Sequence, residues 1–368
     1  MAIAFLQPKI THYRREFYQK LCKQLHVDIF TFADNELKKF NFQDGAIEHY
    51  PVWGIKIGPI PFYFPWRMFS RKYQVWVIGG YWFHPATWCL LILGRLLGRR
   101  VVVWGHGISV KRYQAEYRHP PMRMKMIYRL ACGAMFYTEK ELSLWRKILP
   151  DKPMVALGNT VGNVDDILKP IPSDRETLKK KHKIVTPVNF IFCARFNIRL
   201  RRSDLLLEAI RILPPETYGF IIIGDGKYKP DLDGFGNVYD FGQLYDDSIK
   251  RELFSIADCY FQPAWLGLSV VEAMAYGLPI CTLRRQNGIA QCVEYFYVEA
   301  SGCGILLNDI GEMPARMAGM THDDFKTMGQ LGRSYVAENL SIDQMVARAA
   351  DLLGKLSPSA VFQRDPLV

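Results

Sequence analysis

The sequence predicts an α/β protein of two doubly wound domains, each built on a parallel sheet. At 368 residues the chain is longer than one ordinary domain, and its 49% hydrophobic content is enough for two cores. Short apolar segments alternate with polar, helix-like segments in both halves of the chain. This alternation breaks once, at residues 169–173, which contain two prolines and precede a charged segment.

The first half contains five short segments rich in β-branched and aromatic residues, a composition typical of buried parallel strands. These segments are residues 2–6, 27–32, 75–78, 101–104 and 134–137. The helix-like segments of this half are residues 14–25, 85–97, 121–132 and 139–147. Strands that alternate with helices in this way predict a doubly wound sheet.

A second set of alternating elements follows the break. Strands are expected at residues 188–193, 219–223, 238–241, 259–262 and 280–283, and helices at 203–213, 246–256 and 342–355. We therefore expect one domain at residues 1–170 and another at 171–345. Residues 346–368 form a C-terminal helix and tail that is expected to pack back on the first domain.

Cysteine use and apolar run lengths predict a cytoplasmic protein. The eight cysteines are scattered without a C-x-x-C pair, which favours a reduced compartment. The longest apolar stretch, residues 86–94, ends at Arg95, well short of the roughly 20 residues that a membrane-spanning helix needs. The first six residues follow no cationic segment, so they are expected to be a strand rather than a signal peptide.

Positive charge is concentrated in the first half. Residues 1–170 carry a net charge of +13 and the remainder −2, and residues 95–129 hold nine basic residues and one acid. Residues 59–72 combine aromatic rings, prolines and further cations. This composition suits the interface of a membrane with anionic lipids, while a solvated basic face or a loop packed on its own domain are the plain alternatives. A nucleic-acid surface is a third interpretation, but no known recognition motif accompanies it.

The most informative segment is residues 263–280. A glycine-containing loop leads into a short helix, and a further glycine and a proline separate that helix from an apolar strand. Gly267, Leu268 and Ser269 lie at the start of the helix, where free N–H groups can hold a phosphate. Glu272 lies one turn into the helix, on the face that would meet the sugar end of a nucleotide. These features together predict a nucleotide-sugar site.

Several motifs occur in order around this segment. They are residues 193–196 with Arg201, 204–209, 223–226, 238–242, 257–263 and 267–279. Taken together they resemble the carboxyl domain of GT-B glycosyltransferases, specifically the retaining family usually numbered four. In the first half, Asn159-Thr160-Val161 resembles the family's segment before the domain crossover. The resemblance implies two Rossmann-like domains facing each other across a cleft, the first for the acceptor and the second for the nucleotide-sugar donor.

The resemblance also implies roles for residues of the donor side. Arg195 and Arg201 match the two cations that grip the donor diphosphate, although the second is Lys in the family and the spacing here is one residue longer. Fixed cations stabilise the charge that builds on the departing diphosphate without a metal ion. The structural alternative is a charged surface loop. The remaining positions that match the donor-binding segments are Gly224, Gly242, Gln243, Leu244, Gly267, Leu268, Ser269 and Glu272.

One position departs from the family pattern. Glu272 matches the second acid of a Glu-x7-Glu motif, which bonds the ribose hydroxyls, but Ala264 stands where the first acid is expected. In relatives the first acid contacts hydroxyls of the donor sugar, so its loss leaves the identity of that sugar open. The plain alternative for Glu272 is an acid that complements the helix dipole.

The first half offers candidates for the acceptor side. His106 ends a predicted strand, and in relatives a His at a comparable place reaches toward the donor sugar; a structural hydrogen bond is the alternative role. Other residues follow the predicted first and third strands, where relatives place acceptor-facing groups. They are Thr11, His12, Tyr13, Gly80 and Tyr81.

We therefore expect an enzyme that moves a hexose-type sugar from a UDP- or GDP-linked donor to a hydroxyl of a lipid-linked or cell-surface glycan. Lipopolysaccharide or capsule biosynthesis, at the inner face of the cell membrane, fits this expectation. No metal or other cofactor is expected, since Asp231-x-Asp233 lies in a polar connection and is interpreted as solvated. The alternative, motivated by Ala264, is a catalytically impaired nucleotide-sugar-binding protein. Donor base and sugar, acceptor, linkage and oligomeric state stay open.

Overall fold

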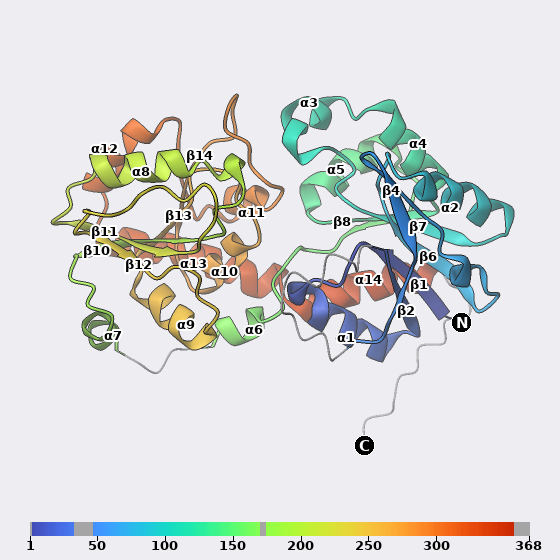
Figure 1. The fold of residues 1–368 in the computed structure, drawn as a ribbon, viewed down its shortest axis with the longest axis horizontal. Coiled ribbons are helices and arrows are strands. Elements are labelled where there is room, and N and C mark those ends of the chain that lie inside the picture. The colour runs from blue at the N-terminus through green and yellow to red at the C-terminus, as the bar shows by residue number, and fades with distance from the viewer. Residues whose placement is uncertain (1, 33–46, 170–173, 357–368) are drawn as a thin grey trace, which may run out of the picture. The chain divides into compact units, whose positions relative to one another are not determined.

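The protein has two compact α/β units in a computed structural model that describes residues 2–32, 47–169 and 174–356 (Figure 1). The first unit runs to Gly162 and resumes at Ile342, and the second spans Asn163–Ser341. The sequence placed these boundaries after residues 170 and 345. Residues 170–173, most of the predicted break, and the tail after residue 356 lie outside the described residues.

The first unit is built on a parallel sheet in the order β3-β2-β1-β6-β7-β8-β9. Its strands are β1 (Ala2–Gln7), β2 (Val27–Thr31), β3 (His49–Pro51), β6 (Tyr73–Gly79), β7 (Arg100–Trp104), β8 (Gly133–Phe136) and β9 (Met154–Ala156). The five predicted strands are confirmed, with ends close to the expected ones. The short strands β3 and β9 at the two edges were not predicted.

Helices α1 (Arg15–Gln24), α2 (Pro85–Leu96), α3 (Tyr113–Arg118), α4 (Met122–Leu130) and α5 (Glu139–Ile148) connect these strands. The last helix, α14 (Ile342–Leu356), returns to this unit and packs against α1, β8 and β9. Its buried stripe, which includes Met345, Val346, Ala349 and Leu353, recurs at helical spacing and accounts for this packing. A separate antiparallel hairpin, β4 (Gly54–Ile57) and β5 (Ile60–Tyr63), stands outside the main sheet.

The second unit is also a parallel sheet, in the order β12-β11-β10-β13-β14-β15. Its strands are β10 (Val188–Cys193), β11 (Tyr218–Ile223), β12 (Val238–Asp240), β13 (Cys259–Phe261), β14 (Ile280–Leu283) and β15 (Gly304–Leu307). Its helices are α6 (Val164–Ile167), α7 (Arg175–Lys181), α8 (Ser203–Ile212), α9 (Asp247–Ile256), α10 (Ser269–Ala275), α11 (Tyr295–Ser301), α12 (Met313–Ala318) and α13 (His322–Asn339).

Both sheets therefore have the doubly wound topology that was predicted, since the chain moves outward from one central strand and then crosses to its other side. The strand order reverses between β1 and β6 in the first unit and between β10 and β13 in the second. Crevices outside the carboxyl ends of parallel strands form at such reversals and are the usual ligand sites of these sheets. We therefore expect ligand sites at the loops that follow these four strands.

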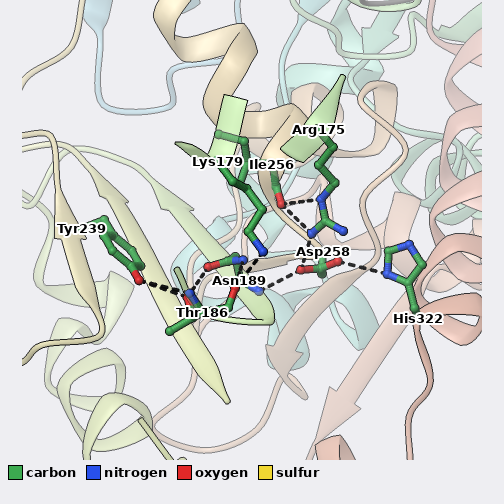
Figure 2. A network of polar contacts seen from close by, with 8 residues as sticks. All are labelled: Arg175, Lys179, Thr186, Asn189, Tyr239, Ile256, Asp258 and His322. Carbon is green, nitrogen blue, oxygen red and sulfur yellow. Dashed lines mark hydrogen bonds and ion pairs between the residues drawn. The ribbon is translucent and has the colours of Figure 1, made fainter. Parts of the chain in front are cut away.

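A buried polar network ties the amino ends of the second sheet together (Figure 2). Asp258, just before β13, accepts a hydrogen bond from the backbone N–H of Asn189 at 2.8 Å and forms an ion pair with Arg175 at 2.6 Å. The Arg175 guanidinium also donates to the carbonyl of Ile256. Asp258 belongs to one of the motifs that suggested the family, and its contacts give it a structural role at the edge opposite the carboxyl ends.

Within the described residues no helix combines the length and the apolar character that crossing a membrane requires. All eight cysteines are free thiols.

Candidate active site

A half-buried guanidinium group marks the strand reversal of the second sheet. Arg201 ends the 3-10 turn η5 (Arg199–Arg201), which follows β10, and one of its terminal nitrogens donates to the carbonyl oxygen of Arg195. Its Nε is buried without a hydrogen-bond partner in the described part of the chain. No carboxylate among the described residues forms an ion pair with it. Burial lowers the pKa of Arg201, which records the energetic cost of holding this cation away from water.

The neighbours of Arg201 place it beside the loop that the sequence singled out. Its charge acts on the phenol of Tyr260 in β13, and the Tyr260 hydroxyl lies 2.9 Å from Oγ of Ser269, the first residue of α10. Arg195 is exposed and close enough for the two guanidinium groups to repel each other. The structure therefore brings Arg195, Arg201 and Ser269 to one reversal point. Two cations with no anionic partner among the described residues leave room for a bound anion.

The loop before α10 is held by buried amide side chains. Gln262 donates from Nε2 to the carbonyl oxygens of Ala264 and Trp265, at 2.9 and 2.7 Å. Gln291 accepts from the N–H of Leu266 at 2.9 Å and donates to the carbonyl of Leu283. Trp265 adopts a left-handed conformation with φ +57°. The loop is thus fixed at both edges before a ligand arrives, which reduces the ordering that binding requires.

The predicted residues at the helix start differ in their surroundings. A Cβ built at Gly267 would have no heavy atom within 4 Å, so this backbone faces open space. Leu268 is the cap residue of α10 and is half-buried, as is Ser269. Because α10 has only seven residues, its dipole is weak compared with the charge of two guanidinium groups. The charge that favours an anion at this point comes from the arginines.

Glu272 forms an ion pair that the sequence analysis missed. Its Oε1 lies 2.6 Å from Nζ of Lys250 on α9, and both side chains are largely buried. Burial opposes the charge of Lys250, but the Glu272 carboxylate outweighs it and raises the pKa of Lys250. Both charges also act on the thiol of Cys193 at the end of β10, as does that of Arg201. Glu272 therefore belongs to the same group, with one carboxylate oxygen engaged by a cation.

The loops after β11 and β12 are joined through two of the predicted glycines. The N–H of Gly224 donates to the carbonyl of Gly242 at 2.7 Å. Gly224 has φ +138°, and a Cβ there would collide with the carbonyl oxygen of Ala194, so this position requires glycine. Gln243 is exposed and accepts from Tyr245, and Leu244 is half-buried. No recorded contact between described residues links these last two side chains to Arg201 or Glu272.

In the first unit, the predicted acceptor-side residues gather at the reversal between β1 and β6. Thr11 and His12 lie at the start of the turn that follows β1, and the phenol of Tyr81 lies close enough to Tyr13 for the two to interact electrostatically. Gly80 donates from its N–H to the carbonyl of Trp104 at the end of β7. All five predicted residues therefore follow neighbouring strands of this sheet.

His106 lies in the same group, two residues beyond the end of β7. Its ring is 4.3 Å from that of Tyr137, and Nδ1 is buried without a hydrogen-bond partner in the described residues. Burial, aided by the charge of Arg14, lowers the pKa of His106 to about 4. The imidazole is therefore neutral at physiological pH and offers an unsatisfied ring nitrogen.

His84 gives this unit a second neutral imidazole and a measurable pH dependence. Burial lowers the pKa of His84 to about 4, and its Nδ1 forms a hydrogen bond of 2.8 Å with the hydroxyl of Tyr63. The imidazole of His84 binds a proton near pH 6.5 in the unfolded chain but only near pH 4 in the folded protein. The unfolded state therefore binds more protons between these values, and the unfolding free energy should fall as the pH drops from about 6.5 toward 4. We expect His84→Gln, which keeps an acceptor but does not titrate, to reduce this slope in urea unfolding curves. The same substitution at exposed His119 should leave the slope unchanged, and equal slopes for wild type and His84→Gln would contradict the assignment.

The chain is similar to known proteins in part of its sequence and in its fold. Residues 187–322 match the family model described as glycosyl transferases group 1. The whole chain is similar to HepE from Anabaena, solved in complex with UDP, with a TM-score of 0.71 at 15% identity over 96% of this chain and 100% of that one. It is also similar to WaaG, a glycosyltransferase involved in lipopolysaccharide biosynthesis, with a TM-score of 0.60 at 17% identity over 95% and 99% of the chains. Residues 187–322 are therefore similar to the glycosyl transferases group 1, and the whole chain has the GT-B fold of these two solved structures.

A curated relative agrees with this assignment over part of its length. An uncharacterized glycosyltransferase of Haemophilus influenzae is 25% identical over 167 residues. The aligned part spans 43% of each chain, so the match covers less than half of that relative. The recognised family type and the two-sheet fold are thereby confirmed, whereas membership of the retaining family four stays a prediction.

The structure gives a reason for the departure of this chain from the Glu-x7-Glu motif. Ala264 is fully buried in a small apolar cluster with Leu283 and Ile289, against which Leu205 packs. A glutamate at this position would bury its carboxylate among hydrocarbon side chains. The loop that Gln262 and Gln291 hold in place is thus compatible with a small apolar residue here.

We expect Ala264→Glu to lower the unfolding free energy by about 3 kcal/mol, because the new carboxylate loses its hydration without gaining a partner. Urea unfolding measures the change. Ala300→Glu, on the exposed face of α11, is the matched control and should be close to neutral. Unchanged stability together with tighter donor binding would show that position 264 faces the ligand instead.

Several residues of the site were missed at the level of sequence. Lys250 is the single lysine of α9 and stands beside Arg251 and Glu252 in a charged segment, so nothing in its pattern distinguished it. Gln262 was detectable, because it is a polar residue at the end of the apolar segment 259–262. Tyr260 and Gln291 owe their roles to contacts between elements that are distant in sequence.

Proposed function

We propose that this glycosyltransferase moves a hexose-type sugar from a UDP- or GDP-linked donor to a hydroxyl of a lipid-linked or cell-surface glycan acceptor. The observation that carries the proposal is the half-buried guanidinium of Arg201, which has no carboxylate partner among the described residues, beside exposed Arg195 at the strand reversal. A diphosphate supplies the anion that such a site lacks. HepE, which shares the fold, was solved with UDP and with UDP-glucose, and this supports a nucleotide-sugar donor.

The chemistry follows from where charge develops. As the bond between the sugar and the diphosphate breaks, negative charge accumulates on the leaving group, and Arg195 and Arg201 stabilise it. These cations are already in place, so no metal ion is needed for this step in our proposal. Glu272 accepts hydrogen bonds from the ribose hydroxyls with the oxygen that Lys250 leaves unpaired. This interaction positions the donor in both the ground state and the transition state.

The first unit contributes the acceptor side in this proposal. Neutral His106 bonds a hydroxyl of the donor sugar, and the residues around Tyr13 and Tyr81 orient the acceptor. The acceptor hydroxyl attacks from the face that the diphosphate leaves, which gives retention at the anomeric carbon. We also propose that the liganded site excludes water and so limits hydrolysis of the donor.

A panel of nucleotides tests the donor site. Full-length protein is heated with UDP, GDP, UMP, GMP and their sugar conjugates, and the melting temperature is recorded. Because ligands that bind only the native state stabilise it by about 2.7 kcal/mol at a hundred times Kd, one diphosphate should raise the melting temperature clearly more than its monophosphate. Equal shifts for mono- and diphosphates, or no shift with any of them, would remove the diphosphate site.

A nucleotide-sugar-binding protein without turnover is the second candidate, and Ala264 in place of an acid favours it. The two are separated by incubating the protein with the donor identified above and a glycolipid acceptor. The enzyme releases nucleoside diphosphate and labels the acceptor, whereas the binding protein shows the thermal shift alone.

We further propose that the protein works in the cytoplasm, peripherally attached to the inner face of the cell membrane. Its cysteine use and the basic first half support this location. A lipid-linked acceptor would be presented at that surface.

A further inference from the structure

Exposed hydrophobic side chains are concentrated on one part of the first unit. Of the nineteen large hydrophobic side chains exposed in the described part of the chain, fourteen lie between Trp53 and Met126. The most exposed include Trp53 at 80%, Leu96 at 76%, Trp66 at 68% and Ile57 at 61%. We call the surface formed by the hairpin region 53–66, the end of α2 and the start of α4 the apolar face. Contiguous exposed apolar surface of this kind marks an interaction site.

The elements of the apolar face are in contact with one another. Strand β5 packs against α2, and α2 packs against α4 (Figure 1). The guanidinium of Arg123 on α4 lies 4.4 Å from the ring centre of exposed Trp82, just before α2. The face is therefore one surface rather than separate single residues.

The hairpin presents hydrophobic side chains where a soluble hairpin would be polar. Its register pairs Ile55 with Phe62 and Ile57 with Ile60, so four apolar side chains share one face. All four are exposed. An isolated two-stranded hairpin is only marginally stable in water, so burial of this face in another medium would stabilise it.

The charge around the apolar face identifies its partner. Residues 49–130 contain thirteen Lys and Arg and a single acid, Glu116. Glu116 is buried and accepts from the N–H of Ser109 at 2.6 Å, so it does not offset the surface charge. Tryptophan and aliphatic side chains bordered by cations suit the headgroup level of a bilayer that contains anionic lipids. A second copy of this face would bring like charges together.

The hairpin is also anchored to the predicted acceptor side. Tyr63, at the end of β5, stacks on Phe32 with ring centres 4.0 Å apart, and its hydroxyl forms a hydrogen bond with His84. The ring of His84 in turn stacks on Tyr81, at 4.6 Å between centres. This chain of rings connects the apolar face to the carboxyl end of β6.

We infer that the apolar face is a membrane-binding surface, on which the hairpin inserts into the headgroup region of an anionic bilayer. The cations of α2 and α4 hold the surrounding lipid phosphates. A further part of the inference, which rests on the proposed function, is that an acceptor glycan enters at Tyr81 from the lipid surface. The membrane thereby presents the acceptor to the site already oriented.

Vesicle flotation tests the surface. Full-length protein is mixed with vesicles of phosphatidylcholine alone or with 30% phosphatidylglycerol, and bound protein is quantified by its intrinsic fluorescence. We expect binding to the anionic vesicles that weakens with added salt. Ile57→Ser with Trp66→Ser should lower the partition coefficient at least tenfold, because each side chain loses much of its transfer free energy. Val185→Ser, equally exposed in the second unit at 81%, is the matched control and should bind like wild type.

Two further measurements separate the possible outcomes. The double variant should keep its melting temperature, its nucleotide-dependent thermal shift and its rate with a water-soluble acceptor, because only membrane binding is removed. Wild-type protein that fails to float, or a double variant that floats like wild type, would overturn the inference. It would also be overturned if the substitutions abolished a protein dimer seen by light scattering instead of vesicle binding. Absence of sugar transfer with intact flotation would refute the proposed reaction and leave the membrane surface standing.

Discussion

Arg201→Met is expected to slow sugar transfer by about two to three orders of magnitude, with little change in donor KM. The loss corresponds to about 3–4 kcal/mol of transition-state stabilisation, the usual effect of removing one preorganised group aimed at developing charge. The reason is specific to this chain. Arg201 is a half-buried cation with no carboxylate partner among the described residues, so the departing diphosphate is the charge that it is placed to meet. Initial-rate kinetics on the purified protein measure the effect.

Stability provides the discriminating signature for Arg201. Because a half-buried cation without a carboxylate partner costs free energy in the unliganded protein, Arg201→Met should keep or raise the melting temperature while activity falls. Arg201→Lys should retain most of the activity, since lysine occupies this position in the family that the sequence resembles. Arg199→Met, at an exposed position of the same turn, is the matched control and should behave like wild type. A parallel loss of stability and activity in Arg201→Met would instead indicate a structural role.

Glu272→Gln is expected to weaken donor binding about ten- to a hundredfold while changing kcat far less. A hydrogen bond to a charged group contributes about 1.5–3 kcal/mol, and the ribose hydroxyls are bound in ground state and transition state alike. Titration calorimetry with the nucleoside diphosphate measures the affinity directly. Unchanged affinity would remove Glu272 from the donor site.

The partner of Glu272 allows binding to be separated from folding. Lys250→Met should lower the unfolding free energy by about 3 kcal/mol, because it leaves a largely buried carboxylate without its cation. Combining Lys250→Met with Glu272→Gln removes both charges and should recover most of that loss. Donor affinity should stay low in the double variant, since the ribose acceptor is still missing. Recovered affinity would show that the weak binding of Glu272→Gln came from the unpaired lysine.

The central strands of the two sheets could be predicted because strands buried on both faces are short runs of apolar residues in the sequence. Strands β1, β6 and β7 of the first unit, and β10 and β11 of the second, are short apolar runs buried on both faces. Edge strands such as β3 and β9 have three residues each, too few to show a pattern. The hairpin of β4 and β5 escaped because Pro59 and Pro61 interrupt it and its apolar side chains face outward.

The donor site was predictable only in part. Arg195, Arg201 and Glu272 were identified through short motifs, because the glycines and charged residues of these motifs lie at fixed spacing along the chain. That Ala264 lies in a closed apolar cluster, or that Lys250 engages Glu272, depends on which helices pack together. No local pattern contains that information, because the partners are separated by many residues along the chain.

The amino-acid sequence by itself determined the doubly wound architecture, the glycine-containing loop before α10 and the positive charge of the first half, because each depends on neighbours along the chain. Only the tertiary structure decided that Arg201 is half-buried without a carboxylate partner in the described residues, and that three separate segments make one apolar face. Burial and partnership are properties of the folded surface. They exist only once distant segments have packed, and both proposed sites depend on them.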